Sequence, residues 1–388
     1  MSNMKYFFWQ NTNSIHQSAF FKALAGMDAG EVTLIVTMNL PGFRKEMGWS
    51  EPELTGVNII HLNQIKYDWK DIIDQNKSSD CIHIFSGIAA FENVQKAFIH
   101  AIKNNCRTGI FTEPLDFRGL KGKLRQLRGY YHKFLYSSSI EFILPTGKNG
   151  ISQFENWGYK KDIIFEWAYT VENSAVDINM QDLGHQETRF KLMFAGSLIH
   201  RKGYDILINA LGKINHDFIA DFYCLKENEI KSGKIIELES GLHGKLSLLA
   251  FLSNKDLRSK MNDYDLFVLP SRHDGWGAVV CESLMEGTPV LVSKFCGSSS
   301  IMENSNTGKV LQSLDENDLA DQIDYYLKAG KLTIQQRVKN RNWAQKNISG
   351  IAMAAYFQEI VLHLNNRMKT AKPEAPWMKK DEYATSLL

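Results

Sequence analysis

The amino-acid sequence predicts an α/β protein made of two Rossmann-like, doubly wound domains, each with a mostly parallel sheet. Short apolar runs alternate with longer helical stretches along most of the 388 residues, which is the pattern of strands joined by crossover helices. The alternation stops in a polar and acidic stretch at residues 171–188 and then begins again. At roughly 100–200 residues per domain, this length fits two domains.

The first domain is expected over residues 1–170. Its strands are short apolar runs, and helical stretches lie between several of them. We expect strands at Tyr6–Trp9, Val32–Val36, Val57–Leu62, Cys81–Phe85, Thr108–Phe111 and Glu141–Leu144, and helices that include Ser18–Ala25 and Ala89–Lys103.

The second domain is expected over residues 189–345, with residues 171–188 as the linker. Open α/β sheets bind ligands beyond the carboxyl ends of their strands, so a cleft between the two domains is the expected site. We expect strands at Leu192–Ala195, Ala220–Cys224, Leu246–Phe251, Leu266–Leu269 and Pro289–Ser293, and helices at Tyr204–Ile214, Asn254–Met261, Gly277–Glu286 and Glu316–Ala329.

The C-terminal part has the apolar spacing of one long helix, Trp343–Met368. Residues 346–368 are assigned as a separate element after the second domain. Residues 369–388 are polar and contain two prolines, and we expect them to form a loosely held tail.

Composition excludes several classes of protein. The chain has 45 basic and 43 acidic side chains, whereas a dedicated nucleic-acid binder usually has a strongly basic surface. The five cysteines form no Cys-x-x-Cys or Cys/His cluster, which excludes structural zinc and indicates buried free thiols in a reducing compartment. No window approaches the roughly 18 apolar residues of a membrane span, and the first apolar run is too short for a signal peptide. We therefore expect a cytoplasmic protein.

A first candidate motif is the stretch Phe194–Gly203. A buried strand ends at Gly196, and a short loop then carries Arg201 and Lys202 before a helix begins. Arginine offers a forked pair of donors and lysine a point charge, so this loop suits an anion at the carboxyl edge of the sheet. Solvated basic loop residues are the alternative when the loop is considered alone.

A second candidate motif follows the strand that ends before Pro270. The glycine-rich turn Asp274–Gly277 leads into a helix, whose N-terminus carries about +0.5 of an elementary charge and binds anions. Glu282 follows Asp274 by eight positions. Its carboxylate can accept hydrogen bonds from ribose hydroxyls, and Asp274 can accept from sugar hydroxyls. The alternative is a helix-start acid and an exposed helical acid.

These motifs together resemble the retaining nucleotide-sugar glycosyltransferases of the GT-B fold, specifically family 4 of the group 1 glycosyl transferases. The family's two acids, with seven residues between them, match Asp274 and Glu282. Its phosphate motif matches Gly196–Gly203, and its third glycine loop matches Cys296–Glu303. The order and spacing of the motifs agree with those of the family over residues 190–330, whereas the first domain has only a general likeness to the family. The C-terminal helix resembles the one that crosses back to the first domain.

The resemblance implies a role for each matching residue. Arg201 and Lys202 would hold the diphosphate, Glu282 the ribose and Asp274 the donor sugar. Backbone N–H groups would help to hold the sugar and phosphates. The positions implied for donor binding are Gly196, Ser197, Trp276, Gly277, Ala278, Gly297 and Ser298.

Several positions depart from the family pattern. Ser197 and Ser300 replace residues that are commonly charged, and the turn that frames the base begins here at Cys224. A histidine of the first domain often lies near the reacting carbon, and Glu113 stands at the comparable position. His16, in the loop after the first strand, is the other candidate that could line the cleft. His83, on an apolar strand, is expected to be a core residue.

The implied reaction is transfer of a hexosyl-type sugar from a UDP- or GDP-sugar with retention of configuration. Arg201, Lys202 and the helix start at Gly277 would stabilise the departing diphosphate. No Asp-x-Asp motif has metal-like surroundings, so we expect no metal and no cofactor. No pair of carboxylates resembles that of retaining hydrolases, which favours front-face attack over a covalent intermediate.

The acceptor side is less determined. Residues 117–136 interleave basic side chains with leucines and aromatic residues, as a helix lying on an anionic membrane does. This pattern favours a saccharide or lipid-linked acceptor for polysaccharide assembly, and a peripheral position at the inner face of the plasma membrane. An ordinary helix with one buried face is the alternative. For the whole protein, a catalytically silent nucleotide-sugar-binding protein and a phosphorylase or epimerase of the same fold stay open.

Overall fold

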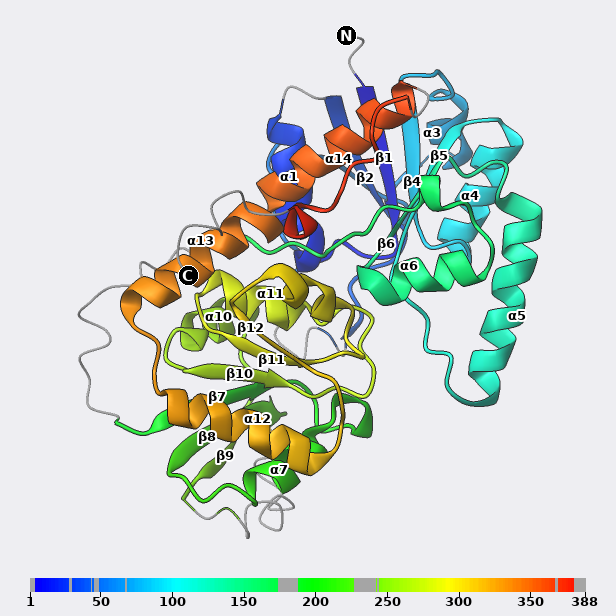
Figure 1. The fold of residues 1–388 in the computed structure, drawn as a ribbon. Coiled ribbons are helices and arrows are strands. Elements are labelled where there is room, and N and C mark those ends of the chain that lie inside the picture. The colour runs from blue at the N-terminus through cyan, green and yellow to red at the C-terminus, as the bar shows by residue number, and fades with distance from the viewer. Residues whose placement is uncertain are drawn as a thin grey trace. The chain divides into compact units, whose positions relative to one another are not determined.

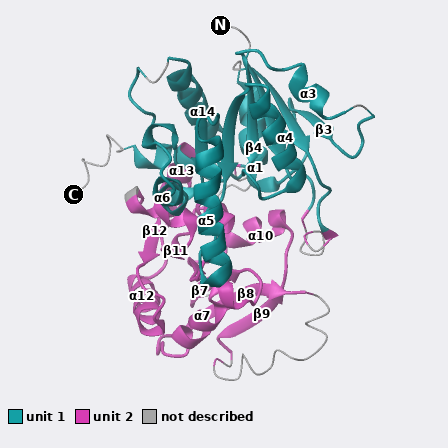
Figure 2. Ribbon diagram, turned by 90° about the vertical axis from the view of Figure 1, so that its right-hand side faces the viewer, with its two compact units in different colours: residues 1–41, 50–172, 347–388 teal, residues 42–49, 173–346 magenta. Residues whose placement is uncertain are grey.

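The computed structural model describes residues 4–27, 30–42, 44, 49–66, 68–173, 188–226, 242, 244–366 and 369–379. The chain divides into two compact units (Figure 2). Unit 1 comprises residues 1–41, 50–172 and 347–388, and unit 2 comprises residues 42–49 and 173–346. Most of the expected linker, residues 174–187, lies outside the described residues.

Unit 1 contains a six-stranded parallel sheet in the order β3-β2-β1-β4-β5-β6 (Figure 1). Each strand expected from the sequence is present, because continuous apolar runs suit strands that are covered on both faces. The elements are β1 (Met4–Gln10), α1 (Ile15–Gly26), β2 (Gly30–Val36), β3 (Asn58–His61), α3 (Lys70–Asp74), β4 (Cys81–Ser86), α4 (Glu92–Lys103), β5 (Arg107–Thr112), α5 (Gly119–Tyr136), β6 (Phe142–Pro145), α6 (Gly147–Asn156) and η1 (Lys161–Ile163).

The two faces of this sheet carry different helices. On one face, Trp9 and Phe85 pack in a core that includes Phe98 of α4. On the other face, Phe8 contacts Phe20 of α1 and Phe357 of α14 (Gly350–Asn365). Helix α14 therefore returns the C-terminal part of the chain to unit 1, as the GT-B resemblance implies.

The C-terminal region differs from its prediction in two ways. The single helix expected at Trp343–Met368 is divided into α13 (Ile334–Ile348) and α14, because Ser349 leaves the helical conformation and caps α14 through a hydrogen bond from the N–H of Ala352 (3.2 Å). The described part of the expected tail, residues 369–379, is also better held than expected, because Trp377 of η5 (Pro376–Met378) is only 1% exposed, and residues 380–388 lie outside the described residues.

Unit 2 contains a second six-stranded parallel sheet in the order β12-β11-β10-β7-β8-β9. The sequence missed only the strand β12, a short edge strand that begins with glycine and lysine. The elements are β7 (Phe190–Ala195), η3 (His200–Lys202), α7 (Tyr204–Leu211), β8 (Phe218–Leu225), β9 (Leu246–Ala250), α10 (Asn254–Met261), β10 (Leu266–Leu269), α11 (Ala278–Met285), β11 (Val290–Ser293), η4 (Gly297–Asn304), β12 (Gly308–Leu311) and α12 (Glu316–Ala329).

Candidate functional site

The candidate residues of unit 2 lie at the carboxyl edge of its sheet. Strands β7 and β10 are neighbours, and the strand order runs from them in opposite directions. Doubly wound sheets bind ligands at such a topological switch point, beyond the ends of the two strands. The loops that follow β7 and β10 are the two that carry the predicted basic pair and the first predicted acid.

The loop after β7 is shaped by two glycines. Gly196 has φ +151° and Gly203 has φ +70°, conformations that side chains with a Cβ rarely adopt. A Cβ on Gly203 would stand 2.1 Å from the carbonyl oxygen of Pro270, in the loop after β10. Glycine at this position therefore lets the two loops approach each other, and η3 carries Arg201 and Lys202 beside the second loop.

The loop after β11 is joined to the loop after β10 by backbone hydrogen bonds. The N–H of Asp274 donates to Phe295 (3.1 Å), that of Gly297 donates to Asp274 (3.1 Å), and that of Ser298 donates to Trp276 (2.9 Å). The resemblance implied that the N–H groups of Gly297 and Ser298 hold the donor. Both N–H groups donate within the protein and join the two loops, and the implied role of this loop in holding the donor stays a prediction.

Arg201, Lys202 and Asp274 come together in one ion cluster. Lys202 Nζ lies 2.6 Å from Asp274 Oδ2, and Arg201 Nη1 lies 3.5 Å from Asp274 Oδ1. Arg201 also donates to the carbonyl oxygen of His273 (2.9 Å). The side chains of Lys202 and Asp274 are 17% and 13% exposed, and that of Arg201 is 39% exposed. The cluster therefore holds two cations around one internal carboxylate and keeps a net positive charge.

The start of α11 borders this cluster. Gly277 has φ +84° and precedes Ala278, and no side chain caps the helix. Ser298 is buried, and its Oγ has no hydrogen-bond partner among the described residues, although it lies 3.2 Å from the point where a Cβ of Gly277 would stand. The Asp274 carboxyl carbon lies 3.9 Å from the same point. The helix start thus combines a positive dipole end with an unsatisfied hydroxyl.

Trp276 does not add its ring to this surface. Its side chain is 1% exposed and belongs to the core of unit 2. The role implied for Trp276 is therefore restricted to its backbone.

Glu282 is buried inside α11, so it is not the exposed helical acid that was the alternative. Its side chain is 3% exposed, and its Oε1 accepts a hydrogen bond from Asn254 Nδ2 (2.8 Å). Burial raises the pKa of Glu282, while nearby Arg258 opposes the shift. A carboxyl group that is desolvated and oriented in this way is suited to accept hydrogen bonds from a ligand's hydroxyl groups.

Sequence reasoning missed Asn254 and Arg258 on α10. Arg258 Nη2 lies 2.6 Å from Oε1 of the buried Glu286. Asn254 and Arg258 are four residues apart, as are their partners Glu282 and Glu286, so one side of α10 pairs with one side of α11. The equal spacing of the two pairs is the signal in the sequence that could have indicated this contact between α10 and α11.

Glu113 and His16 belong to unit 1. Glu113 follows β5 and is exposed. His16 lies in the first turn of α1, half-buried, with its ring stacked on Tyr169 at 6.0 Å. Both follow strands of the first sheet, but His16 lies in a helix and not in the loop that the sequence predicted, because Ser14 caps α1 before it.

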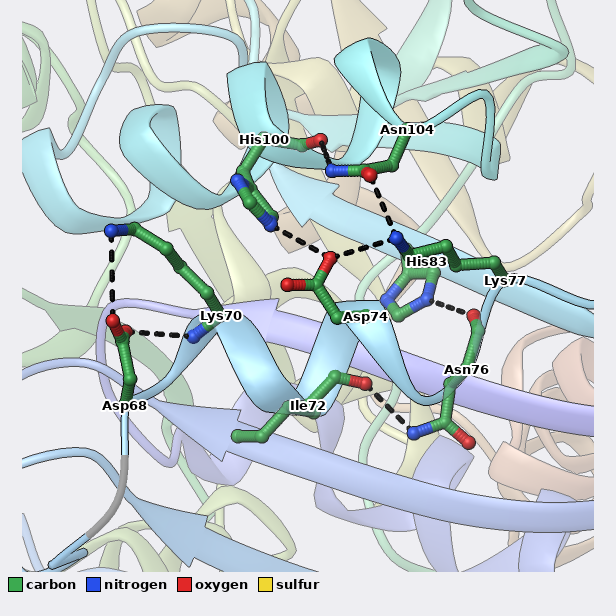
Figure 3. A network of polar contacts seen from close by, with 9 residues as sticks. All are labelled: Asp68, Lys70, Ile72, Asp74, Asn76, Lys77, His83, His100 and Asn104. Carbon is green, nitrogen blue, oxygen red and sulfur yellow. Dashed lines mark hydrogen bonds and ion pairs between the residues drawn. The ribbon is translucent and has the colours of Figure 1, made fainter.

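His83 is a core residue, as the sequence predicts. Trp9 Nε1 donates to His83 Nδ1 (3.2 Å), and His83 Nε2 bonds the carbonyl oxygen of Asn76 (2.9 Å), as Figure 3 shows for the second contact. Burial lowers the pKa of His83 to about 4, so the ring is neutral at pH 7. Nearby, the contact of Asp74 with His100 joins α3 to α4 and belongs to a network of polar contacts that links structural elements.

Three further observations concern the described residues. All five cysteines are buried, and none forms a disulfide within the described part of the chain, as predicted. No group of three His, Cys, Asp or Glu side chains within the described ranges is arranged to hold a metal ion. None of the helices described is both long and apolar enough to cross a membrane.

Comparisons with known proteins agree with this arrangement. Residues 176–344 match the family Glycosyl transferases group 1. An uncharacterized glycosyltransferase of Methanocaldococcus jannaschii, MJ1607, is 26% identical over 129 residues, which is 33% of each chain. The lipopolysaccharide core biosynthesis glycosyltransferase LpsE of Rhizobium meliloti is 22% identical over 52% of this chain and 58% of its own. The chain thus spans about a third of the first relative and more than half of the second.

The fold has solved counterparts. The structure of Anabaena HepE in complex with UDP has a TM-score of 0.67 with 15% identity, covering 93% of this chain and 99% of that one. The likeness extends over both units taken together and shows the two-domain GT-B fold that the sequence predicts.

Proposed function

We propose that this chain, whose residues 176–344 carry the glycosyl transferases group 1 domain, transfers a sugar from a nucleoside diphosphate donor to an acceptor. The observation that carries the proposal is the cluster of Arg201, Lys202 and Asp274 at the switch point of the second sheet, beside the free start of α11. Two cations and a helix N-terminus form an anion site, and an adjacent buried acid suits the ribose.

The cluster suggests how the leaving group is stabilised. When the bond between the sugar and the diphosphate breaks, negative charge develops on the departing phosphate oxygen. Arg201 and Lys202 are positioned to receive this charge, and fixed donors in a partly desolvated site do so without reorganisation. Because these side chains supply positive charge, we propose that transfer needs no bound metal. Turnover that survives EDTA supports this part, and turnover lost to EDTA and restored by Mg²⁺ contradicts it.

Retention of configuration is the stereochemical part of the proposal. Asp274 is paired with Lys202 at 2.6 Å, and Glu282 is buried against Asn254, so neither carboxylate is a good nucleophile. Attack of the acceptor on the same face that the diphosphate leaves is therefore favoured over a covalent intermediate. Proton NMR of the first product formed would show a retained anomeric configuration, whereas an inverted product refutes this mechanism.

The donor is proposed to be a UDP- or GDP-sugar of the hexosyl type. The complex of HepE with UDP supports a uridine nucleotide. Titration calorimetry with UDP and GDP separates the two, because the nucleotide that fits the base pocket should bind at least tenfold more tightly, about 1.4 kcal/mol.

The main test replaces Lys202. Lys202→Ala removes the cation nearest Asp274, and we expect a loss of transfer of at least a hundredfold with the fold intact, the size seen when a transition-state donor is removed. Release of nucleoside diphosphate from a panel of UDP- and GDP-sugars measures it. Lys213→Ala is the matched control, because Lys213 pairs with Glu316 at 2.7 Å on the surface of the same unit. Near-normal turnover in Lys202→Ala would contradict the proposed transfer from a nucleoside diphosphate donor.

The same assay separates the rival functions. A catalytically silent binding protein would bind the nucleotide and release none, and an epimerase would change the sugar without an acceptor. Ser300, where the family commonly has an acid, is buried, and its Oγ donates to the carbonyl oxygen of Gly297 (3.2 Å).

We further propose that α5 contacts an anionic membrane surface on the cytoplasmic side, where a saccharide or lipid-linked acceptor is presented. Figure 1 shows α5 at the outer side of unit 1. One side of the helix exposes large apolar side chains at alternating intervals of four and three residues. They are Leu120 (80% exposed), Leu124 (66%), Leu127 (65%), Tyr131 (60%) and Phe134 (82%).

The opposite side of α5 packs on unit 1 through glycines. A Cβ on Gly129 would stand 1.9 Å from Cε2 of Trp157, and one on Gly122 would stand 2.0 Å from the carbonyl oxygen of Phe117. The helix therefore lies directly on the unit and turns its apolar side outward. The sequence had left open whether that face is buried, and the exposed fractions answer that it is not.

Charge selects the partner of this surface. The helix carries five basic residues and no acidic residue, namely Lys121, Lys123, Arg125, Arg128 and Lys133. A second copy of the same helix would bring like charges together, whereas anionic headgroups neutralise them while acyl chains cover the leucines. An anionic bilayer is therefore the occupant that we propose.

Flotation with vesicles tests this surface. The protein should float with vesicles of phosphatidylglycerol and phosphatidylcholine and stay behind with phosphatidylcholine alone. Leu124→Ser with Phe134→Ser should abolish flotation. Ile351→Ser with Leu362→Ser is the matched control, because these side chains are also exposed (61% and 53%) on α14 of the same unit. Equal flotation of both variants, or a dimer that the first variant dissolves, would overturn the proposal.

A further inference from the structure

Arg272, two positions before Asp274, makes a forked ion pair that the sequence did not indicate. Its Nη1 and Nη2 donate to Asp205 Oδ1 and Oδ2, both at 2.7 Å, and Nη1 also donates to the carbonyl oxygen of His200 (2.7 Å). These hydrogen bonds lower the pKa of Asp205. Two parallel charge-assisted bonds fix direction as well as distance, which a lysine at this position would not do.

The contacts of Arg272 converge on the turn that carries the basic pair. While its side chain holds the carbonyl group of His200, its backbone N–H donates to the carbonyl oxygen of Arg201 (2.8 Å). Asp205 lies in the first turn of α7, directly after this turn. The turn is thus attached at two successive carbonyl groups and at the helix that follows, all by one residue of the loop after β10.

Stability alone is a weak reason for this arrangement. The side chains of Arg272 and Asp205 are 20% and 37% exposed, and partly exposed ion pairs contribute little to folding. What the pair does determine is where the backbone of Arg201 and Lys202 stands relative to Asp274. Long flexible side chains deliver their charge to a defined place only when their backbone is held.

We propose that Arg272 and Asp205 are positioning residues for the diphosphate site. Their forked pair holds the His200–Lys202 turn, so that the charged ends of Arg201 and Lys202 meet at the place where the diphosphate binds. This inference rests on the proposed function for the identity of the ligand. Neither residue touches the ligand in this scheme, and both act through Arg201 and Lys202.

Pyrophosphate and UDP are the probes that test the inference on the full chain. Arg272→Lys keeps the charge and loses the fork, and Asp205→Asn removes the partner charge. Each should weaken binding of both probes about tenfold in calorimetry, the effect of losing one forked charge-assisted bond. The double variant should lose no more than either single variant, because both break the same contact.

Unit 1 provides a matched control. Arg107 and Glu141 form a forked pair of similar exposure, 20% and 26%, with Nη2 to Oε1 at 2.6 Å. Arg107→Lys should lower the melting temperature as much as Arg272→Lys does and leave pyrophosphate affinity unchanged. Unchanged affinity in Arg272→Lys, or an equal loss in Arg107→Lys, would overturn the positioning role alone. If the wild-type protein binds neither probe nor GDP, the proposed function fails and the inference falls with it.

Discussion

The ion cluster predicts that removing the Asp274 carboxylate strengthens the binding of a free nucleoside diphosphate. In the structure, Asp274 forms ion pairs with the two cations that the diphosphate needs, at 2.6 Å from Lys202 and 3.5 Å from Arg201. A diphosphate must therefore displace or share this internal counter-ion. Asp274→Asn keeps the size of the side chain and the backbone hydrogen bonds to Phe295 and Gly297, and removes only the competing charge.

The size of the effect follows from the burial of the pairs. Two charges about 4 Å apart near a protein surface interact by about 4 kcal/mol, and solvent reduces exposed pairs to about 0.2–1 kcal/mol. The Lys202–Asp274 pair is 17% and 13% exposed and lies between these limits, whereas Arg201, at 39%, adds little. We take about 1.4 kcal/mol for the whole cluster, which corresponds to about tenfold tighter binding.

The assay is titration calorimetry of UDP or GDP, whichever the wild-type protein binds, at fixed ionic strength. Transfer should fall in the same variant, because Asp274 also contacts the donor sugar in the proposed site. Tighter product binding together with slower transfer distinguishes a counter-ion from a residue that contacts only sugar. Asp324→Asn serves as control, because Asp324 pairs with Lys328 at 2.6 Å on the surface of unit 2. An unchanged or higher Kd in Asp274→Asn refutes the reasoning.

Three further predictions concern the frame of the site and the core. Glu282→Gln should raise the melting temperature by an amount that grows with pH from 4 to 8. The reason is that burial raises the pKa of Glu282, so that its ionisation in the folded protein costs stability above that pKa. A melting temperature at pH 8 that is no higher than that of the wild-type protein would contradict this. Gly203→Ala should lower the free energy of unfolding by about 2 kcal/mol, because the new Cβ would stand 2.1 Å from the carbonyl oxygen of Pro270 and the residue would have φ +70°. A urea unfolding midpoint equal to that of the wild-type protein would contradict this prediction. Because the pKa of His83 is lowered from 6.5 to about 4, wild-type stability should fall as the pH drops through this interval, and His83→Gln should flatten that fall; an equally steep fall in the variant would mean that other groups cause it.

The sequence alone determined every strand of the two sheets except β12, the glycine turns and the class of fold. Apolar runs predict buried parallel strands because every residue of such a strand is covered by helices on both faces. The turns at Gly203 and Gly277 follow from glycine's access to positive φ, which is a property of the residue itself. These signals are local, so they can be recognised without knowing what lies nearby in space.

The tertiary structure decided which side chains meet. Lys202 and Asp274 are 72 residues apart and pair because β7 and β10 are adjacent in the sheet, an order that no local pattern encodes. The same holds for Asn254 with Glu282, and for Gly129 of α5 against Trp157. The apolar spacing of α5 predicted two faces, and only packing decided that the leucine face stays outside. Charge pairing and exposure depend on neighbours in space, and for that reason the contacts within the site came from the structure, whereas the roles came from the resemblance.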